Sequence, residues 1–315
     1  GGQGARQWAH GGPARPSRLS ARDIEALRIE RLLRGGRGRK PGDPVARTSR
    51  GTPLGALFMK PSGTWVLGRR VDGRELSLRP TPADAAHRLP GHERLGCQAC
   101  HTAWTHQCAA CHTRLEPAGE QWDNVVGART AGRWVETGGD MRIDRPTLGI
   151  DPRGRIGPFI PGMPLVAAFG DVRISRRLFA PADPHTTTRE ARPCASCHAD
   201  PLALGLGRGR LWRLDGSWHF EPAPPPEASS TAPIPAWPDG VPWDGWTGPQ
   251  GPGLAEATRT GARPFGPGEL RRILDVSLCL PCHGRYDDPL YKDYRGGLER
   301  LRSGEAPRCA GPREP

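Results

Sequence analysis

The stretch Cys97-Gln98-Ala99-Cys100-His101 contains the pattern Cys-x-x-Cys-His, which recurs three times further along the chain. The other copies are Cys108-Ala109-Ala110-Cys111-His112, Cys194-Ala195-Ser196-Cys197-His198 and Cys279-Leu280-Pro281-Cys282-His283. We call the four copies motif 1 to motif 4 in chain order. The chain has 9 cysteines and 10 histidines among 315 residues, so a random order would produce far fewer than one copy. The repetition therefore indicates one chemical task that is performed at four places.

Each motif has the spacing that is typical of a c-type haem attachment site. Two thiols three residues apart can form thioether bonds with one macrocycle, and the histidine after the second thiol can bind the iron as its proximal ligand. The sequence therefore predicts four c-type haems with their irons. The predicted attachment residues are Cys97, Cys100, Cys108, Cys111, Cys194, Cys197, Cys279 and Cys282, and the predicted proximal ligands are His101, His112, His198 and His283. A zinc site formed by the cysteines of motifs 1 and 2 is the alternative, but it explains neither the histidine in every motif nor the two isolated motifs.

Histidines outside the motifs can supply the second axial ligand of each iron. We expect these distal ligands to lie within or just before the haem-binding stretches of the chain. The candidates are His87, His92, His106 and His185, with His10 and His219 in reserve. The competing ligands are Met59, Met141 and Met163, of which Met163 is the best placed, and methionine ligation would raise the reduction potential. The sequence leaves open which histidine binds which iron.

The motifs and the supply of histidines resemble those of the multihaem c-type cytochromes, the low-potential bis-histidine electron carriers of bacterial and archaeal respiration. The resemblance is specific at the four motifs and covers about residues 85–290. It implies a tetrahaem cytochrome that is not an enzyme. Such a protein transfers single electrons along closely spaced haems, between respiratory redox partners outside the cytoplasmic membrane.

Two other functions are compatible with the same cofactors. A multihaem oxidoreductase acting on a small nitrogen or sulfur compound needs an open iron position, often with lysine in place of a motif histidine. Here all four motifs end in histidine, and the only lysines are Lys40, Lys60 and Lys292. The other alternative is a subunit of an extracellular cytochrome filament or of a larger respiratory complex, in which His10 would bind a haem of a neighbouring chain.

Glycine and proline are frequent, with 43 and 36 residues, about a quarter of the chain. This composition is close to that of disordered chains, but four large apolar macrocycles would give the loops a surface on which to pack. We therefore expect a mostly irregular multihaem cytochrome c fold, with few short helices and small antiparallel hairpins packed around four haems. Without haem, the chain should be poorly folded.

The sequence divides into two parts. Residues 1–50 form a basic arm rich in glycine and arginine, with a short helix that starts at Ser20 and Asp23 and ends at Gly35. Residues 51–315 form the tetrahaem domain. Within it we expect a small antiparallel meander at 54–78, haems 1 and 2 at 85–116, haem 3 at 185–200, a hairpin around Asp215-Gly216, a strap rich in proline and tryptophan over the surface at 221–267, and haem 4 at 268–290, next to a helix. Motifs 1 and 2 are so close in sequence that their haems should be neighbours.

The net charge of +12 admits binding to nucleic acid. Two propionates on each of four haems would offset much of this charge, so we expect a solvated basic surface and no nucleic-acid partner. The expected partners are redox proteins, other cytochromes or copies of the same chain.

No run of apolar residues is long enough to span a membrane, although surface association remains compatible with the sequence. Covalent haem attachment predicts a periplasmic or extracellular location. Cys309 lies outside the motifs and has no predicted role.

Overall fold

The computed structural model describes residues 17–29, 39–47, 51–69, 72–79, 81–109, 111–137, 140–224, 239–249 and 251–305. The chain divides into two compact units, Gly1–Arg88 and Leu89–Pro315. The division therefore falls after residue 88, whereas the sequence suggested residue 50. The physical reason is that strands on both sides of residue 50 pair with each other in a single sheet. All four motifs belong to the second unit.

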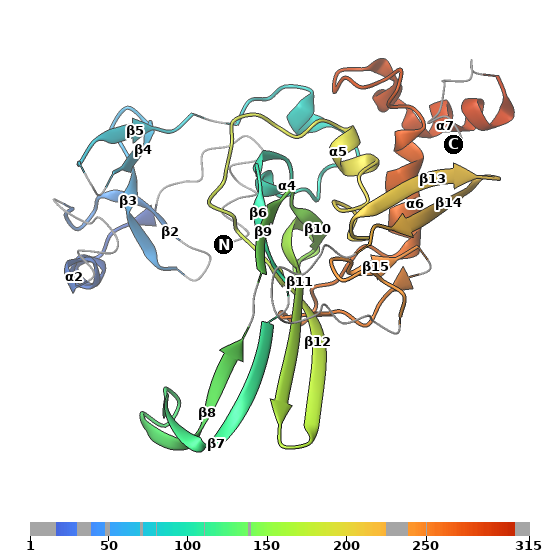
Figure 1. The fold of residues 1–315 in the computed structure, drawn as a ribbon. Coiled ribbons are helices and arrows are strands. Elements are labelled where there is room, and N and C mark those ends of the chain that lie inside the picture. Colours follow the sequence, from blue (N-terminus) through green and yellow to red (C-terminus); the bar gives the residue numbers. More distant parts are fainter. Residues whose placement is uncertain are drawn as a thin grey trace. The chain divides into compact units, whose positions relative to one another are not determined.

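Among its described residues, the first unit has a five-stranded antiparallel sheet and the α-helix α2 (Figure 1). Its elements are β1 (Ser17–Arg18), α2 (Ala21–Ile29), β2 (Pro44–Arg47), β3 (Pro53–Met59), β4 (Trp65–Gly68), β5 (Glu75–Ser77) and the 3-10 helix η1 (Ala86–Arg88). The strands pair in chain order, so the predicted meander is confirmed. A small core of its own holds the unit together, formed by Leu19, Ile24, Leu27 and Val45.

Helix α2 begins where the sequence predicts. The Ser20 backbone N–H donates to Asp23 Oδ2 at 2.8 Å, and the Asp23 N–H donates back to Ser20 Oγ at 3.1 Å. This reciprocal pair satisfies two N–H groups that have no partner inside a helix. The predicted end of the helix, Gly35, lies outside the described residues.

The second unit contains a sheet with the strand order β17-β12-β11-β7-β8, and β10 pairs with β11. Its strands are β7 (Cys111–Asp123), β8 (Ala128–Thr137), β10 (Thr147–Ile150), β11 (Ile156–Phe169), β12 (Val172–Pro181) and β17 (Glu256–Ala257). The hairpins β7–β8 and β11–β12 extend away from the helices of this unit, and parallel pairing of β7 with β11 joins them (Figure 1). The described chain thus has more and longer strands than the irregular fold that we expected.

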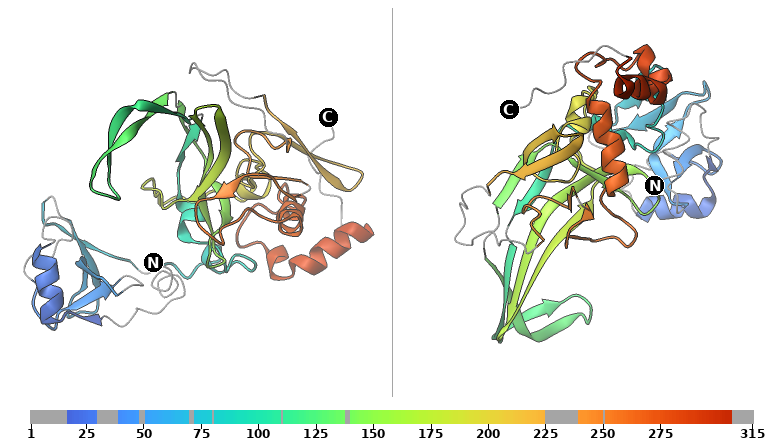
Figure 2. Two further views of the ribbon diagram at one scale, coloured as in Figure 1. Left: turned by 90° about the horizontal axis from the view of Figure 1, so that it is seen from below. Right: turned by 90° about the vertical axis from the view of Figure 1, so that its right-hand side faces the viewer.

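Short elements surround this sheet. They are α4 (Cys97–His101), β6 (Thr105–Ala109), β9 (Asp140–Asp144), α5 (Ala195–His198), β13 (Gly209–Leu214), β14 (Ser217–Pro222), β15 (Thr247–Gly248), β16 (Gly251–Pro252), α6 (Pro267–Ser277), η2 (Pro289–Lys292) and α7 (Tyr294–Ser303). Strands β13 and β14 form the predicted hairpin, which lies beside α6 in both figures of the ribbon (Figures 1 and 2). Its turn residues Asp215 and Gly216 have φ angles of 47° and 78°, as two-residue hairpin turns require.

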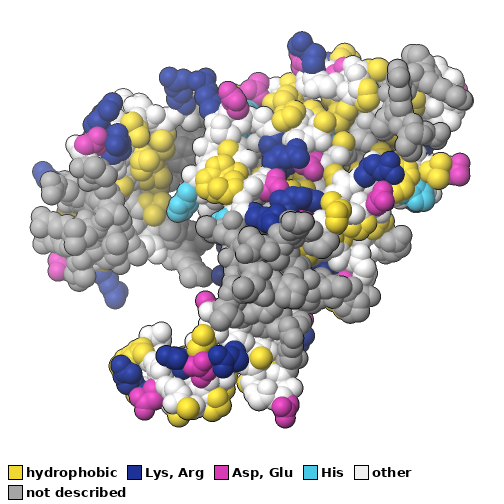
Figure 3. All heavy atoms as spheres, viewed as in Figure 1, with side chains coloured by type: hydrophobic (Ala, Val, Ile, Leu, Met, Phe, Trp, Pro, Cys, Tyr) yellow, Lys and Arg dark blue, Asp and Glu magenta, His cyan; other side chains and the backbone are white. Residues whose placement is uncertain are grey.

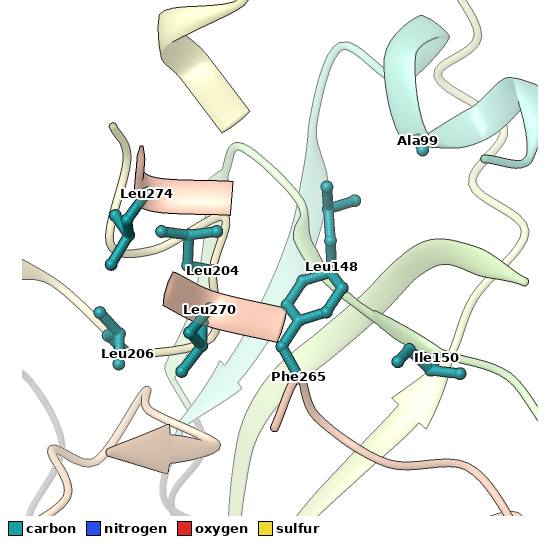
Figure 4. Close-up of a cluster of buried hydrophobic side chains, with 8 residues drawn as sticks. All are labelled: Ala99, Leu148, Ile150, Leu204, Leu206, Phe265, Leu270 and Leu274. Carbon is teal, nitrogen blue, oxygen red and sulfur yellow. The ribbon is translucent and has the colours of Figure 1, made fainter. Parts of the chain in front are cut away.

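The main core lies between α6, α4 and β10. Leu270 and Leu274, four residues apart on α6, belong to one cluster with Leu148 and Ile150 of β10 and with Ala99 of motif 1 (Figure 4). The cluster is completed by Leu204, Leu206 and Phe265. The predicted helix before motif 4 is therefore confirmed, and its apolar face belongs to the same core as Ala99 of motif 1.

The segment rich in tryptophan is placed differently from our prediction. Trp243 is 5% exposed, and Trp246 is 1% exposed and stacks on Phe179 with ring centroids 4.7 Å apart. The rings of Trp246 and Phe159 are 4.5 Å apart. Residues 241–247 therefore help to form a second core instead of a strap over the surface. Burial of large apolar rings is strongly favourable, and the sequence pattern of this segment did not reveal which face would be covered.

On the face shown in Figure 3, the Lys and Arg side chains of the described residues lie in several separate groups, many of them with acidic side chains nearby. Ion pairs such as Arg133–Glu116, at 2.7 Å, are typical of this pattern. In the described part of the chain, no helix has the length and apolar character needed to cross a bilayer.

Candidate functional site

Motifs 1 and 3 lie side by side, although about ninety residues separate them in sequence. The Thr188 N–H donates to the His101 carbonyl at 2.7 Å, and the Arg192 N–H donates to the Cys100 carbonyl at 2.9 Å. The chain that leads into motif 3 therefore runs along motif 1. Burial raises the pKa of the Cys100 thiol to about 11, and the neighbouring thiol of Cys197 adds to this effect. Thiols of the two motifs thus share one partly buried region.

Motif 4 joins this region from the end of α6. Cys194 Sγ of motif 3 lies 3.8 Å from the carbonyl oxygen of Gly284, directly after motif 4. The Tyr286 hydroxyl donates to the Arg192 carbonyl at 2.6 Å. Three motifs therefore meet in the second unit in the order 1, 3, 4. The sequence predicts motif 2 as the neighbour of motif 1, and this prediction stays untested because the side chains of motif 2 lie outside the described residues.

The three motif histidines with described side chains share one feature: ring nitrogen Nδ1 lies within hydrogen-bond distance of an oxygen acceptor. His101 Nδ1 is 3.1 Å from the Thr188 carbonyl oxygen, and His198 Nδ1 is 2.8 Å from the Ile273 carbonyl oxygen. His283 Nδ1 is 3.0 Å from Asp288 Oδ2. Histidines that bind metals almost always donate their other ring N–H to such an oxygen, which fixes the tautomer and the ring orientation. In all three motifs, a metal ion would therefore be bound through Nε2.

Sequence reasoning missed the tyrosines. The chain has 3 tyrosines, and all of them follow motif 4 within a short stretch: Tyr286, Tyr291 and Tyr294. Burial raises the pKa of Tyr286 and of Tyr291 to about 12, and nearby cysteine thiols of the motifs add to both shifts. The Tyr291 hydroxyl donates to the His283 carbonyl. Their confinement to one stretch beside a motif was the signal in the sequence that could have identified them.

His92 is the distal candidate that the structure brings to a motif histidine. Its ring lies against the ring of His198, with centroids 5.9 Å apart and planes at 72°. Burial lowers the pKa of His92 and of His198.

The other candidates have different surroundings. His106 and His185 are exposed, and His219 is exposed and stacks on Trp212 at 5.7 Å. His87 belongs to the first unit, where its Nδ1 lies 2.7 Å from Asp84 Oδ1. Met59 also belongs to the first unit, in β3. His10, Cys309 and the side chains of Met141 and Met163 lie outside the described residues.

A cavity of about 590 Å³ runs along α6, towards the helix end that precedes motif 4. Leu211, Trp218, Leu270 and Leu274 contribute its apolar wall, and Arg213, Arg271 and Arg302 contribute positive charge. Two of these side chains have buried nitrogen atoms without a hydrogen-bond partner, Arg213 Nε and Trp218 Nε1. The Tyr294 hydroxyl, near Cys279, is buried without a partner as well. Unpartnered buried polar atoms are costly, so Arg213 and Trp218 could donate to a group with acidic oxygens in this cavity, whereas Arg302 already pairs with Asp275 at 2.9 Å.

Among the side chains that the structure describes, no three His, Cys, Asp or Glu residues converge as they would around a bare metal ion. A haem iron takes most of its ligands from the porphyrin and needs only axial ligands from the protein. Pairs of ring nitrogens are therefore the pattern relevant to haem.

No family model, curated protein or solved structure matches this chain.

Proposed function

We propose that this protein is a tetrahaem c-type cytochrome that transfers single electrons between redox partners outside the cytoplasmic membrane. The observation that carries the proposal is the combination of four Cys-x-x-Cys-His motifs with the oriented histidines of motifs 1, 3 and 4. A random order of residues would not produce four such motifs. A purely structural role for the histidines would not require that their rings be oriented at Nδ1.

The residues present fit covalently bound haem. In each motif, the two cysteines would form the thioether bonds and the histidine would bind the iron. In motifs 1, 3 and 4, the oxygen at Nδ1 would orient the ring so that Nε2 binds. Arg213 Nε and Trp218 Nε1 could donate hydrogen bonds to the propionates of a haem. The apolar wall of the same cavity could cover part of the haem ring. When bound, the iron supplies reversible one-electron chemistry, whose potential depends on the axial ligands and on burial.

An electron carrier suits this arrangement better than an enzyme. An enzyme needs an iron position that stays open to substrate, whereas a carrier has both axial positions filled and its haems close together. The direct contacts from motif 1 to motif 3 and from motif 3 to motif 4 favour a continuous series of haems. The terminal redox partners are proposed by class only, as proteins or copies of this chain.

Haem content tests the proposal directly. The chain is produced with a haem-attachment system, and its intact mass is compared with the mass of the polypeptide. We expect the added mass of four haems, and a low-spin ferric spectrum by electron paramagnetic resonance. Rapid carbon monoxide binding at one haem of the reduced protein would instead indicate an enzyme. A colourless protein, or one that carries metal without tetrapyrrole, would refute the cytochrome.

A further inference from the structure

We infer that His92 is the distal ligand of the haem attached at Cys194 and Cys197, on the face opposite His198. This inference rests on the proposed function and deepens it, because it assigns one pair of axial ligands among the candidates. It also means that a residue just before motif 1 serves the haem of motif 3.

The distance between the two rings carries the inference. An imidazole nitrogen binds a metal at about 2 Å, so two rings on opposite sides of one ion have centroids about 6 Å apart. The observed separation between the rings of His92 and His198 is 5.9 Å. Their planes are inclined at 72°, so the contact is not a parallel stack. The spacing therefore suits one shared iron.

The surroundings of the two rings agree with this assignment. Both side chains are partly buried. His198 Nδ1 is held by the Ile273 carbonyl, so the orientation of its ring is set from the side of α6.

The position of His92 is set by its backbone. The His92 N–H donates to the Leu89 carbonyl at 3.2 Å, and the His92 carbonyl accepts from the Leu95 N–H at 3.0 Å. Its Nδ1 is buried and makes no well-aligned hydrogen bond. A buried ring nitrogen without a well-aligned partner is costly, and a bond from Nδ1 to iron would offset this cost.

The pairing has a consequence for the order of the haems. Residues 92–101 would then supply a ligand to haem 3 and both cysteines and a ligand to haem 1. The same ten residues would hold these two haems next to each other. The backbone hydrogen bonds between motif 1 and the chain before motif 3 reinforce this connection.

Counting altered haems in single and double variants tests the pairing. In the full-length, haem-loaded protein, His92 and His198 are replaced by alanine separately and together, and haem per chain is measured first. High-spin ferric haems are then counted by electron paramagnetic resonance, and carbon monoxide uptake is measured in the reduced protein. If the two histidines share one iron, each single change converts one haem of four, and the double variant still converts only one. The matched control His219→Ala, at an exposed histidine, should convert none.

Two results would overturn the pairing while leaving the cytochrome intact. One is a His92→Ala protein whose four haems all stay low-spin. The other is a double variant in which two haems become high-spin.

If the alanine variants are produced with fewer than four haems, His92→Met replaces the test because it keeps the iron six-coordinate. That variant should show a methionine-to-iron absorption band and a raised potential at one haem, and absence of the band would count against the pairing. A wild-type chain without haem would instead refute the proposed function, and the pairing with it.

Discussion

The hydrogen-bond partners of the motif histidines would influence the reduction potential of each iron. The partner of His283 is a carboxylate, whereas the partners of His101 and His198 are backbone carbonyls. A carboxylate at Nδ1 makes the imidazole a stronger donor and stabilises the ferric ion more than a carbonyl does. Among these three haems, the haem of motif 4 should therefore have its potential lowered most by this interaction.

Asp288→Asn tests this effect. The amide keeps the shape of the side chain but removes its negative charge, so the potential of one haem should rise. If the preference for ferric over ferrous iron falls tenfold, the rise is about 60 mV. Spectroelectrochemical titration measures the change. Asp287→Asn is the matched control, because Asp287 pairs with Arg285 at 2.9 Å, and equal shifts in both variants would contradict the role of Asp288.

At this scale, the sequence supports a prediction of the chemistry of the motifs, which stays untested, but it does not reveal their spatial relations. Cysteine and histidine spacing within five residues is a local property, so the attachment residues and proximal ligands could be proposed directly. The contact of His92 with His198 depends on how two distant segments pack, which spacing cannot reveal. His106 and His185 were equally reasonable candidates in sequence, yet they are exposed in the structure.

Among the elements, α6 is the one that brings motif 4 to the other motifs. Glu269 caps its start: the Gly266 N–H donates to Glu269 Oε2 at 2.9 Å, and Arg263 donates to both carboxylate oxygens, at 2.7 and 3.1 Å. The hydrogen bond from Arg263 is the main cause that lowers the pKa of Glu269 to about 2, against the opposing effect of burial. The folded protein therefore binds this proton less readily than the unfolded chain.

Glu269→Gln should reduce the free energy of unfolding at neutral pH by about 1 kcal/mol, because the charge that pairs with Arg263 is lost. Since the folded pKa is below the ordinary value of 4.5, the stabilisation is present above about pH 4.5 and lost as the pH falls towards 2. The variant should therefore lose part of the pH dependence of stability between these values. Chemical denaturation at several pH values measures it. Glu299→Gln, on the exposed side of α7, serves as the control, and matching pH profiles for both variants would contradict the role of Glu269.

Trp246→Ala tests the second core. The ring of Trp246 lies between those of Phe159 and Phe179, so its removal leaves a large cavity. We expect a loss of about 3–5 kcal/mol in the free energy of unfolding. Trp122→Ala removes a ring that is 60% exposed and should change stability by less than about 0.5 kcal/mol. If denaturation curves showed similar losses for the two variants, the buried role of Trp246 would be contradicted.

Element prediction succeeded where the signal was local. The helix start at Ser20, the meander, the hairpin at Asp215-Gly216 and the apolar face of α6 all follow from neighbouring residues. The long strands β7 and β11 were not expected, because their parallel pairing joins residues more than fifty positions apart. The burial of Trp243 and Trp246 also depends on distant partners, so a stretch rich in proline and tryptophan resembled a surface strap.

Across the whole molecule, the two units should differ in how they depend on the proposed haems. The first unit contains no Cys-x-x-Cys-His motif and has its own sheet and core, whereas the second contains all four motifs. Loss of haem should therefore expose the backbone amides of the second unit to solvent, while the sheet of the first unit remains formed. From the sequence we expected the whole chain to be poorly folded without haem, and the separate sheet and core of the first unit limit this expectation to the second unit.

Hydrogen exchange on the chain produced with and without haem attachment measures this difference. Without haem, we expect the amide protons of β3 and β4 to keep their slow exchange, because their ladder is closed within the first unit. The amides of α4 and α5 should exchange fast, since these helices have only five and four residues and hold motifs 1 and 3. The haem-loaded chain is the control and should be protected in both units. Fast exchange throughout the haem-free chain would show that the first unit needs the second, and slow exchange throughout would show that the second unit folds without haem.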